Sequence, residues 1–383
     1  MSVYLDYNAS APIDERVLQY MIDIYKHDIG NADSRTHDYG NSAREVVEKA
    51  RNQVASILDV SKEEVFFTSG ATESNNIVIQ GLRKYGEQVG KKHIITTSIE
   101  HKAVLEAAKS LIDYGFEVEF VKPEHTGRIN AESVEAKVRK DTLLVSVMHV
   151  NNETGIIQPV KEIGEFLSNK DVFFHVDATQ SFGKLVEELK VLKYDMLSMS
   201  AHKLCGPQGV GTLVMRRKQY KLPPVKNIMY GGQQEHGLRP GTIPVALVGG
   251  LGEACRIAAQ EYKENALYFR EIKEKIIHEL EMSQLKYSFN GDPSYCIDST
   301  MNISIEGVSS EALMLASKQY CGVSNGSACN SSSYNLSYVL EAMNIEEEKI
   351  RNAIRVSWGP GVIEDQVIQE FSKLLQVAKQ LAF

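Results

Sequence analysis

Short apolar runs alternate with amphipathic stretches between about residue 44 and residue 215. The stretch REVVEKARNQVASIL (44–58) has its apolar residues at the spacing of a helix. Five runs are typical of strands buried on both faces: EVFFT (64–68), HIITT (93–97), LLVSVMHV (143–150), VFFHV (172–176) and MLSMS (196–200). This alternation predicts an α/β fold with a mostly parallel sheet covered by helices.

The pattern changes beyond about residue 255. Helical stretches at roughly 257–283 and 364–381 flank strands in which apolar and polar residues alternate, MNISIE (301–306) and AIRVSW (353–358). In a chain of 383 residues, which is long for one domain, this change predicts two domains. We expect a large α/β domain over residues 15–258 and a smaller α+β domain made of residues 1–14 and 259–383.

The composition is that of a soluble globular protein, with 43% hydrophobic and 24% charged residues. The formal net charge of −8 and the pI of about 5.8 argue against a nucleic-acid-binding surface as the main function. No apolar run approaches the ~20 residues of a membrane span, and the start, MSVYLDYNAS, lacks the regions of a secretory signal. We therefore expect a cytoplasmic protein that contacts neither membranes nor nucleic acid directly.

The five cysteines are an odd number and are scattered, without a C-x-x-C pair. They favour free thiols in a reducing compartment over a disulfide framework or a zinc site, and we expect no metal. Cys255 and Cys321 lie in core-like contexts, and the sequence assigns no role to Cys205 or Cys296. Cys329 sits in SNGSACNSSSYN (324–335), where nine of twelve residues are Ser, Asn or Gly. That composition predicts a mobile surface loop, an unusual place for a thiol.

Polar side chains follow every one of the five predicted strands. After these strands come, in order, SGATES, SIEH, NNETG, DATQ and AHKLCG. In open α/β sheets, ligands bind just beyond the carboxyl ends of the strands. We therefore expect the functional site at this edge of the sheet.

SGATESNN (69–76) combines a turn of small residues with the start of a helix. The free backbone N–H groups and the positive dipole end at such a start suit a phosphate. The ordinary alternative is a capped helix with Ser69 or Thr72 as the N-cap. The chain has no G-x-x-x-x-G-K-[ST] motif, which argues against a nucleoside triphosphate.

Lys203 and Asp177 both follow buried strands. A lysine enclosed by small residues such as Gly206 and Gly209 can form a Schiff base, whereas a lone loop lysine is more often solvated. A partly buried Asp177 carboxylate needs a partner, which is either the cationic ring nitrogen of a cofactor or a structural arginine or helix cap.

His101 and Arg355 complete the set of candidates. His101 can stack on a flat ring or move protons near neutral pH, although a lone histidine is more often structural. Arg355 lies on the polar face of its strand and is free to clamp a carboxylate, unless it is a solvated surface arginine. The phosphate cradle and these four side chains together describe pyridoxal 5′-phosphate with an amino-acid substrate.

Nine motifs extend this interpretation across nearly the whole chain. They are LDYNASAP (5–12), FTSGATESNN (67–76), EHKAVL (100–105), HVNNETG (149–155), HVDATQ (175–180), SAHKLCGPQGVG (200–211), RPGTIP (239–244), SNGSAC (324–329) and IRVSWG (354–359). In this order they resemble the cysteine desulfurases of the nitrogen-fixation and iron–sulfur-cluster type, which have the type I fold of pyridoxal phosphate enzymes. The resemblance implies that sulfur is taken from L-cysteine, leaving L-alanine and an enzyme persulfide that is passed to acceptor proteins.

The resemblance also implies residue roles. Lys203 would hold the internal aldimine, Asp177 would pair with the pyridinium nitrogen, and Gln180 would bind the phenolic oxygen of the cofactor. His101 would stack on the ring and assist proton transfer. Cys329 would attack the substrate sulfur as a thiolate, after losing its proton to His101.

Further roles concern the phosphate and the substrate. Asn152 would lie beside the cofactor and the substrate carboxylate, with Arg355 as the main clamp. The family forms homodimers with shared active sites, so Thr242 would reach the phosphate from the second subunit. The other phosphate ligands would be Ala71, Thr72, Ser200 and His202.

Three motifs depart from the family pattern. The pattern N-P-S-S-x-H-x-x-G is NADSRTHDYG (31–40) here, without the proline and with one extra residue before His37; R-S-G-T is RPGT (239–242), and S-S-G-S-A-C is SNGSAC. The first two variants resemble the branch that supplies sulfur for DNA phosphorothioation. Iron–sulfur-cluster assembly, tRNA thiolation and DNA phosphorothioation all stay open as pathways, and the acidic pI implies that partner proteins would contact the DNA.

Alternative functions are a selenocysteine lyase, an aminotransferase of the same fold, or a cofactor-free scaffold that presents sulfur acceptors. The shorter-loop desulfurases usually carry R-x-G-x-H-C, which is absent here. An aminotransferase needs no cysteine on a mobile loop, and a scaffold needs none of Lys203, Asp177 and His101. These residues therefore favour the desulfurase.

Overall fold

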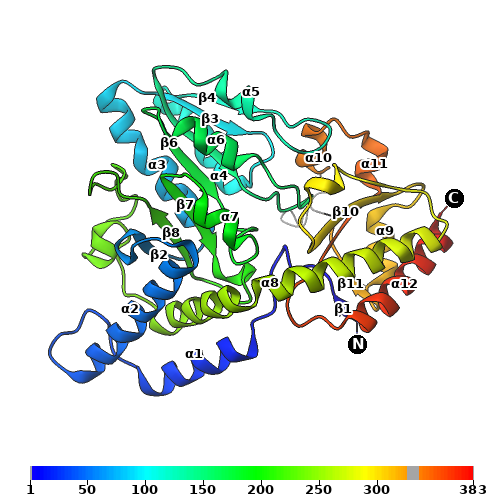
Figure 1. Ribbon diagram of the computed structural model, residues 1–383, viewed down its shortest axis with the longest axis horizontal. Coiled ribbons are helices and arrows are strands. Elements are labelled where there is room, and N and C mark those ends of the chain that lie inside the picture. The colour runs from blue at the N-terminus through cyan, green and yellow to red at the C-terminus, as the bar shows by residue number, and fades with distance from the viewer. Residues whose placement is uncertain (1, 326–335, 383) are drawn as a thin grey trace.

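The structure, a computed structural model, describes residues 2–325 and 336–382. Its largest sheet has seven strands in the order β2-β8-β7-β6-β5-β3-β4. Neighbouring strands are parallel, except that β8 runs antiparallel to β2 and β7. The strands are β2 (Val65–Thr68), β3 (His93–Thr97), β4 (Glu117–Val121), β5 (Thr142–Met148), β6 (Phe173–Asp177), β7 (Met196–Ser200) and β8 (Gly211–Met215). The predicted α/β fold with a mostly parallel sheet is confirmed (Figure 1).

The five predicted strands form β2, β3, β5, β6 and β7, and the bounds of β3 and β7 agree with the prediction. Two strands lacked a clear signal in the sequence. β4 lies at the edge of the sheet and has acidic residues at alternate positions, so it is only partly buried. β8 begins at the last glycine of GPQGVG (206–211), a glycine-rich segment that conceals its start.

Helices cover both faces of this sheet, because alternate strand residues point to opposite sides. One face, with Ile95 and Val145, packs against α2, α6, α7 and the first part of α8. The other face, with Ile94 and Leu144, packs against α3 and α4. The helices up to this point are α1 (Glu15–His27), α2 (Asp38–Leu58), α3 (Ala71–Val89), α4 (Lys102–Lys109), α5 (Ala131–Glu135), α6 (Val160–Leu167), α7 (Val186–Val191) and α8 (Val245–Met282).

A second, antiparallel sheet has the order β12-β10-β9 and forms its own core with the last part of α8 and with α12. Its polar side chains are buried as well as its apolar ones: Asn302 and Arg355, for example, are each 3% exposed. The elements of this part are β9 (Tyr287–Phe289), β10 (Thr300–Ile305), β12 (Ala353–Ser357), α9 (Ser310–Ser317), α10 (Tyr338–Ala342), α11 (Glu347–Arg351) and α12 (Glu364–Leu381). The alternating strands therefore present a buried polar face, and that face contributes to the site described below.

The N-terminal segment joins the two parts. Strand β1 (Val3–Tyr4) pairs in parallel with β11 (Cys321–Gly322), beside the smaller sheet. The chain then continues to the carboxyl edge of the large sheet, where the backbone N–H of Ala11 donates to the carbonyl of His202 at 2.9 Å. Residues 6–11 thus lie between the two sheets.

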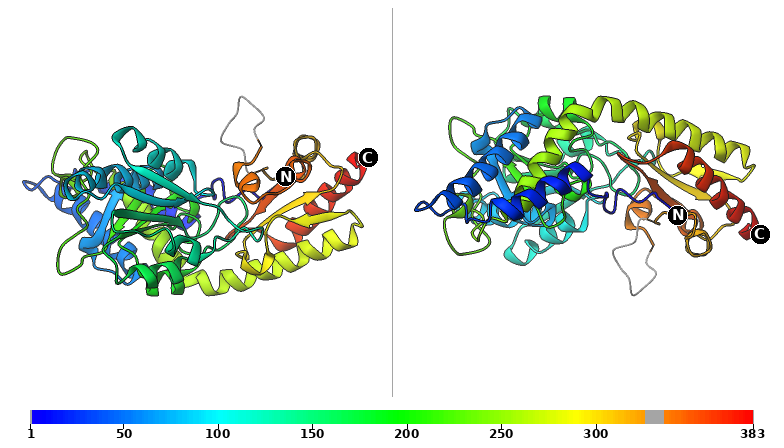
Figure 2. Two further views of the ribbon diagram at one scale, coloured as in Figure 1. Left: turned by 90° about the horizontal axis from the view of Figure 1, so that it is seen from above. Right: turned by 90° about the horizontal axis from the view of Figure 1, so that it is seen from below.

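Helix α8 is continuous for 38 residues and starts twelve residues before the predicted helix at 257. Its first part packs against α1 and α2, and its last part against α12. Cys255 of α8 packs in the core of the large sheet, whereas Phe269 of the same helix packs in the core of the smaller sheet. Figure 2 shows α8 along one side of both parts, with α10 on the opposite side. The division at residue 258 stays a prediction, since α8 passes through it without a break.

Two further helices test the sequence pattern. Helix α12 has the predicted bounds, whereas α2 starts at Asp38, six residues before the predicted 44. The side chain of His37 caps α2 by accepting from the backbone N–H of Gly40. The last residues of the unusual NADSRTHDYG segment therefore form the start of α2. Within residues 2–325 and 336–382, none of the helices is both long enough and apolar enough to cross a membrane.

Candidate active site

Asp177 is the last residue of β6, and its side chain is buried at the carboxyl edge of the large sheet. Its Oδ2 accepts from the Asn75 amide of α3 at 2.8 Å, and its Oδ1 accepts from the backbone N–H of Thr179 at 3.0 Å. In the described part of the chain, no arginine or lysine forms an ion pair with this carboxylate. A structural arginine is therefore not the partner of Asp177.

Lys203 ends a short 3-10 turn (Ala201–Lys203) that follows β7. Its ammonium group donates to the backbone carbonyls of Asn8 and Ala9, both at 2.5 Å. Gln180 donates to the same Asn8 carbonyl at 3.0 Å. Lys203 is thus held by the N-terminal segment and is not a solvated loop lysine.

His101 caps the start of α4. Its Nδ1 accepts from the backbone N–H of Ala103 at 3.2 Å, and burial lowers the pKa of the imidazole below its ordinary value. The ring is therefore neutral at pH 7 and carries its proton on Nε2. In this tautomer His101 can donate a proton from Nε2, and it can accept one only after the ring releases Ala103.

The start of α3 has no side-chain cap, because its N-cap residue is Gly70. The alternative of Ser69 or Thr72 as the N-cap is therefore wrong. Gly70 has a φ of +148°, which other residues rarely adopt, and a β-carbon there would lie 3.4 Å from the Ser200 hydroxyl. The uncapped N–H groups of Ala71 and Thr72 thus begin next to the end of β7, in the arrangement that suits an anion.

The two remaining phosphate candidates differ in position. His202 shares a hydrogen bond of 3.2 Å with the Ser10 hydroxyl, and burial lowers its pKa to about 4, so this ring is neutral. Thr242 is exposed, in a loop before α8. That loop is fixed near the start of α3, because Arg239 pairs with Glu73 at 2.9 Å.

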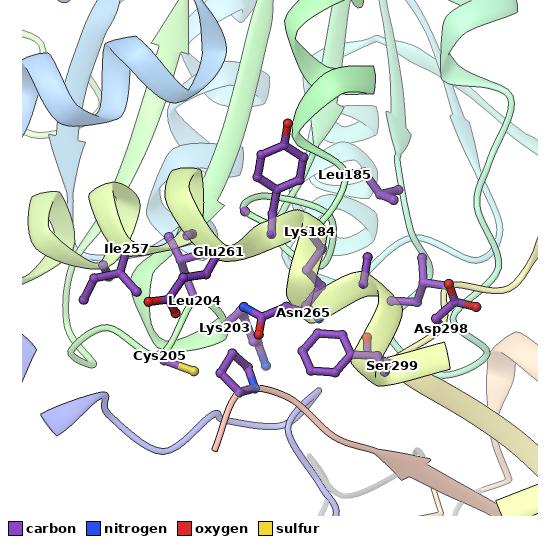
Figure 3. A pocket seen from close by; sticks show the side chains of 18 of the residues that line it. Lys184, Leu185, Lys203, Leu204, Cys205, Ile257, Glu261, Asn265, Asp298 and Ser299 are labelled. Atoms are coloured by element: carbon purple, nitrogen blue, oxygen red, sulfur yellow. The ribbon is translucent and has the colours of Figure 1, made fainter. Parts of the chain in front are cut away.

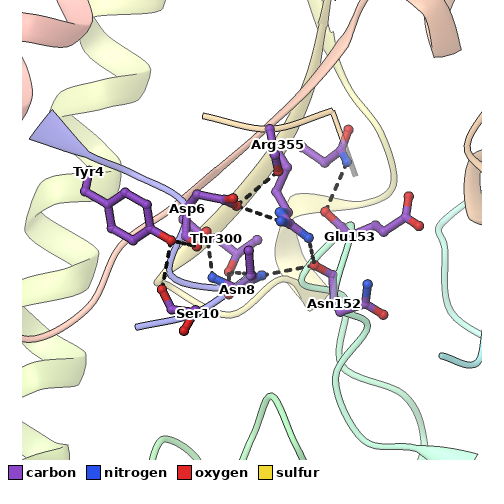
Figure 4. Close-up of polar contacts among 12 residues, drawn as sticks. Tyr4, Asp6, Asn8, Ser10, Asn152, Glu153, Thr300 and Arg355 are labelled. Atoms are coloured by element: carbon purple, nitrogen blue, oxygen red, sulfur yellow. Dashed lines mark hydrogen bonds and ion pairs between the residues drawn. The ribbon is translucent and has the colours of Figure 1, made fainter. Parts of the chain in front are cut away.

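Arg355 lies in the centre of a buried polar network (Figure 4). One of its terminal nitrogens donates to the Asp6 carboxylate at 2.6 Å, and the other to the backbone carbonyl of Asn152 at 2.8 Å. Asp6 also accepts from the Ser324 hydroxyl at 3.0 Å. The expectation of a free or solvated Arg355 is therefore wrong, because Asp6 holds its guanidinium group; only Nε has no partner among the described residues.

We name Asn75, His101, Asp177, Gln180 and Lys203 the strand-end cluster. Several buried oxygen atoms in and beside it have no hydrogen-bond partner in the described chain, namely the amide oxygens of Asn75, Asn152 and Gln180. Buried polar groups without partners are costly unless a ligand completes them. A lysine amine, a buried carboxylate, an uncapped helix start and unpaired amides fit a phosphorylated pyridine aldehyde, so these residues fit pyridoxal 5′-phosphate.

Two buried glutamates were missed by sequence reasoning. Glu100, next to His101, accepts from the Thr97 hydroxyl at 2.8 Å and from the backbone N–H of Met148 at 2.9 Å. Glu153 accepts from the Ser337 hydroxyl at 2.5 Å. Burial raises the pKa of Glu100 to about 8 and that of Glu153 to about 7. Their position in SIEH and NNETG, directly after buried strands, was the signal that could have found them.

Replacing Glu100 with glutamine is expected to flatten the pH dependence of stability. The folded chain keeps the Glu100 proton up to a pKa of about 8, whereas the unfolded chain releases it near 4.5. The free energy of unfolding therefore falls as the pH rises from about 4.5 to about 8, and glutamine removes this loss while keeping both hydrogen bonds to the side-chain oxygen.

The measurement is the melting temperature of both proteins at pH 5 and pH 8. At pH 8, the melting temperature of Glu100→Gln should be higher relative to wild type than it is at pH 5. The matched control is Glu106→Gln, an exposed glutamate of α4 paired with Lys109. An equal pH dependence in wild type and Glu100→Gln would contradict the argument.

The four described cysteines are all free, and three of them are buried: Cys205, Cys255 and Cys321. Burial raises the pKa of every one of the four thiols, that of Cys205 to about 11. These thiols are therefore protonated at neutral pH and are poor nucleophiles. Cys329, the predicted nucleophile, lies outside the described residues.

Comparison with known proteins gives a consistent match. The Aminotransferase class-V family model matches residues 3–368. The cysteine desulfurase IscS of Glaesserella parasuis is 41% identical over 371 residues, which cover 96% of this chain and 90% of the relative.

Solved structures agree with the family model. A NifS-like protein superimposes with a TM-score of 0.91 at 36% identity, covering 99% of this chain and all of that one. DndA from Streptomyces lividans has a TM-score of 0.82 at 42% identity, and the match covers 94% of this chain and 100% of DndA. SspA in complex with cysteine has a TM-score of 0.80 at 34% identity, and the match covers 94% of this chain and 99% of SspA. This chain therefore belongs to the cysteine desulfurases, the pyridoxal phosphate-dependent sulfurtransferases of the class-V aminotransferase family.

Proposed function

We propose that the strand-end cluster is the site where this desulfurase acts, with Lys203 as the residue that binds the cofactor covalently. The observation that carries the proposal is that Asp177, at the end of β6, and Lys203, in the turn directly after the neighbouring strand β7, lie at the same edge of the sheet, and that the buried Asp177 carboxylate has only neutral partners. When bound, pyridoxal phosphate draws electrons away from the substrate's α-carbon. Asp177 would keep the ring nitrogen protonated, and Gln180 would bind the phenolic oxygen.

Proton transfer is assigned to Lys203 and His101. The amine of Lys203 is positioned by two backbone carbonyls, so its nitrogen stays close to the carboxyl edge of the sheet. It would accept the proton from the substrate's α-carbon when it is unprotonated. His101, with its proton on Nε2, would stack on the ring and serve as the proton donor.

The phosphate would lie at the uncapped start of α3. This position is supported by the uncapped backbone N–H groups of Ala71 and Thr72, and by the polar side chains of Ser200 and His202 nearby. Thr242 would come from the second subunit of a homodimer, which sedimentation analysis would test. A chain that stays monomeric at micromolar concentration in the presence of the cofactor would rule out the shared site.

Arg355 and Asn152 would bind the carboxylate of L-cysteine. Asp6 and the Asn152 carbonyl fix the guanidinium group, so its buried Nε remains as a donor to the substrate. The similarity to SspA, solved in complex with cysteine, supports the same amino acid as the ligand here.

Arg355→Lys is expected to raise the KM for L-cysteine at least about tenfold, with a smaller change in kcat. Lysine offers a point charge and cannot hold Asp6, Asn152 and the substrate together, and a lost charge-assisted hydrogen bond is worth about a factor of ten or more. The measurement is alanine formation against L-cysteine concentration. Arg351→Lys, an exposed arginine of α11 paired with Glu347, is the control; equal KM values for the two variants would refute the clamp.

Cys329 is assigned as the sulfur-accepting nucleophile, and both flanks of its segment support this. Before it, Ser324 bonds to Asp6 and pairs with Arg355 through the backbone. After it, Ser337 bonds to Glu153, and the Tyr338 hydroxyl donates to the Glu100 carbonyl at 2.7 Å. The segment therefore begins and ends on residues next to the strand-end cluster.

For the acceptor, we propose proteins of a DNA phosphorothioation system in the cytoplasm. The NADSRTHDYG and RPGT variants support this branch; the chain is also similar to DndA, at an identity of 42% that IscS relatives match. The test offers ³⁵S from labelled L-cysteine to two purified acceptors, an iron–sulfur scaffold and a phosphorothioation protein encoded near this chain. Label on the second supports the proposal, and label on the scaffold alone overturns it.

A further inference from the structure

A cavity with a volume of about 340 Å³ lies beside Lys203 (Figure 3). It is bordered by α8, by the turn after β6 around Lys184, and by residues 294–299 before β10. Of the strand-end cluster, only Lys203 lines it. The cavity therefore adjoins the candidate active site at Lys203.

The walls of this cavity are mainly apolar. An engineered apolar cavity of about 150 Å³ is enough to bind benzene, so this one has room for a body of roughly eight to twelve heavy atoms. The apolar lining comes from both parts of the molecule, including Val17, Leu204, Ile257, Ala258, Phe269 and Ile297. A ligand there would contact both cores.

Most charged groups at the rim already have partners. Arg270 pairs with Asp298 at 3.2 Å. Asp14 and Glu261 both pair with Arg16, at 2.7 Å and 2.5 Å. The pair of Arg270 and Asp298 is neutral, whereas Arg16 shared by two carboxylates leaves one net negative charge at the rim; neither of these carboxylates pairs with Lys184.

Lys184 is the exception. Within the residues that the structure describes, its ammonium group has no hydrogen bond or ion pair, and the side-chain amide of Asn265 has no hydrogen-bond partner either. Both side chains line the cavity, Lys184 from the turn after β6 and Asn265 from α8, and they lie near each other in Figure 3. Burial lowers the pKa of Lys184 to about 8, so it is mostly cationic at pH 7 and lacks a compensating anion.

We propose that this cavity binds a small organic monocarboxylate with an apolar tail of medium length. Its carboxylate accepts from Lys184 and Asn265, and its tail lies along the apolar wall. A single unpaired ammonium matches one negative charge, whereas a phosphate monoester would bring excess charge into an apolar space. No arginine fork of the kind that favours phosphate is left unpaired here, because Arg270 is bound to Asp298.

The test is calorimetric titration of the holoenzyme with three probes of eight carbons each: octanoate, octan-1-ol and octylamine. We expect saturable binding of one octanoate per chain, at least about tenfold tighter than octanol, and no binding of octylamine. Lys184→Met should weaken the binding of octanoate at least about tenfold and leave the affinity for octanol unchanged. Ala258→Phe, which fills the cavity, should abolish binding of both.

Two control variants separate this site from others. Lys190→Met removes a lysine of α7 that pairs with Glu187 and does not line this cavity, and it should bind octanoate like wild type. Arg355→Lys should also keep octanoate binding, which excludes the candidate substrate site. The proposal is overturned if octanoate does not bind saturably up to millimolar concentration, if Lys184→Met binds it like wild type, or if Arg355→Lys abolishes it. The comparison of octanoate binding by Lys184→Met and by wild type still tests the proposal if Ala258→Phe does not fold.

Discussion

Lys203→Ala is expected to lower the turnover of L-cysteine at least about a thousandfold. The substitution removes both the covalent attachment of the cofactor and the proton-transferring amine, and general acid–base catalysis alone contributes about two to four powers of ten. The amine is held by the Asn8 and Ala9 carbonyls, so no other lysine of the described chain takes its position. The measurement is alanine formation, together with borohydride reduction followed by peptide mapping.

A misfolded variant would also lose activity, so the test includes a rescue. Methylamine supplied in solution should restore part of the turnover of Lys203→Ala, because the alanine leaves room for a small amine. Lys190→Ala, on the surface of α7, should behave like wild type. Retention of a few per cent of turnover by Lys203→Ala, or cofactor reduced onto a different lysine, would contradict the assigned role.

Cys329→Ser should abolish sulfide release while L-cysteine still binds and still changes the absorbance of the bound cofactor. A serine hydroxyl is far less nucleophilic than a thiolate, and sulfur transfer needs a nucleophile that can carry the persulfide. We expect the rate to fall at least about a thousandfold, measured as sulfide formed in the presence of a thiol reductant.

The matched control for this prediction is Cys296→Ser. The Cys296 thiol hydrogen bonds to the carbonyls of Thr154 and Thr300, contacts that a hydroxyl can also make, and burial raises its pKa. This variant should keep the wild-type rate. Sulfide release by Cys329→Ser at the wild-type rate would instead point to another sulfur acceptor.

The sequence predicted the large sheet and the position of the site well, for a physical reason. Strands such as β3 and β7 are buried on both faces, so they lack the strict alternation of a half-exposed strand, and ionisable residues follow soon after their ends. His101 and Lys203 follow these two strands. Because parallel strands end at one edge, a one-dimensional pattern was enough to bring these side chains together.

The contacts of the N-terminal segment could not be predicted in this way. Asp6 and Arg355 are 349 residues apart, and no local period links them. Asp6, Asn8 and Ser10 appeared only as letters of a motif, although they contact Arg355, Lys203 and His202 in the structure. Such contacts depend on the packing of one sheet against the other.

The start of α8 was missed for a different reason. Its first part contains Gly249, Gly250 and Gly252, and each glycine in a helix costs about 1 kcal/mol relative to alanine. The glycines are needed for close packing, since a β-carbon at Gly252 would lie 2.5 Å from the Cα of Ala50 in α2. Tertiary contact thus overrides a local preference that argued against a helix.

The anchoring of Ser324 to Asp6 and Arg355 also limits how far sulfur can be carried. Cys329 follows Ser324 by five residues, and an extended chain spans at most about 3.6 Å per residue. The Cα of Cys329 therefore stays within a radius of about 18 Å around that of Ser324. On the proposed role of Cys329, an acceptor has to bring its receiving atom to within this radius plus the length of the cysteine side chain and its bound sulfur, so we expect its docking face on the surface around residues 324 and 337.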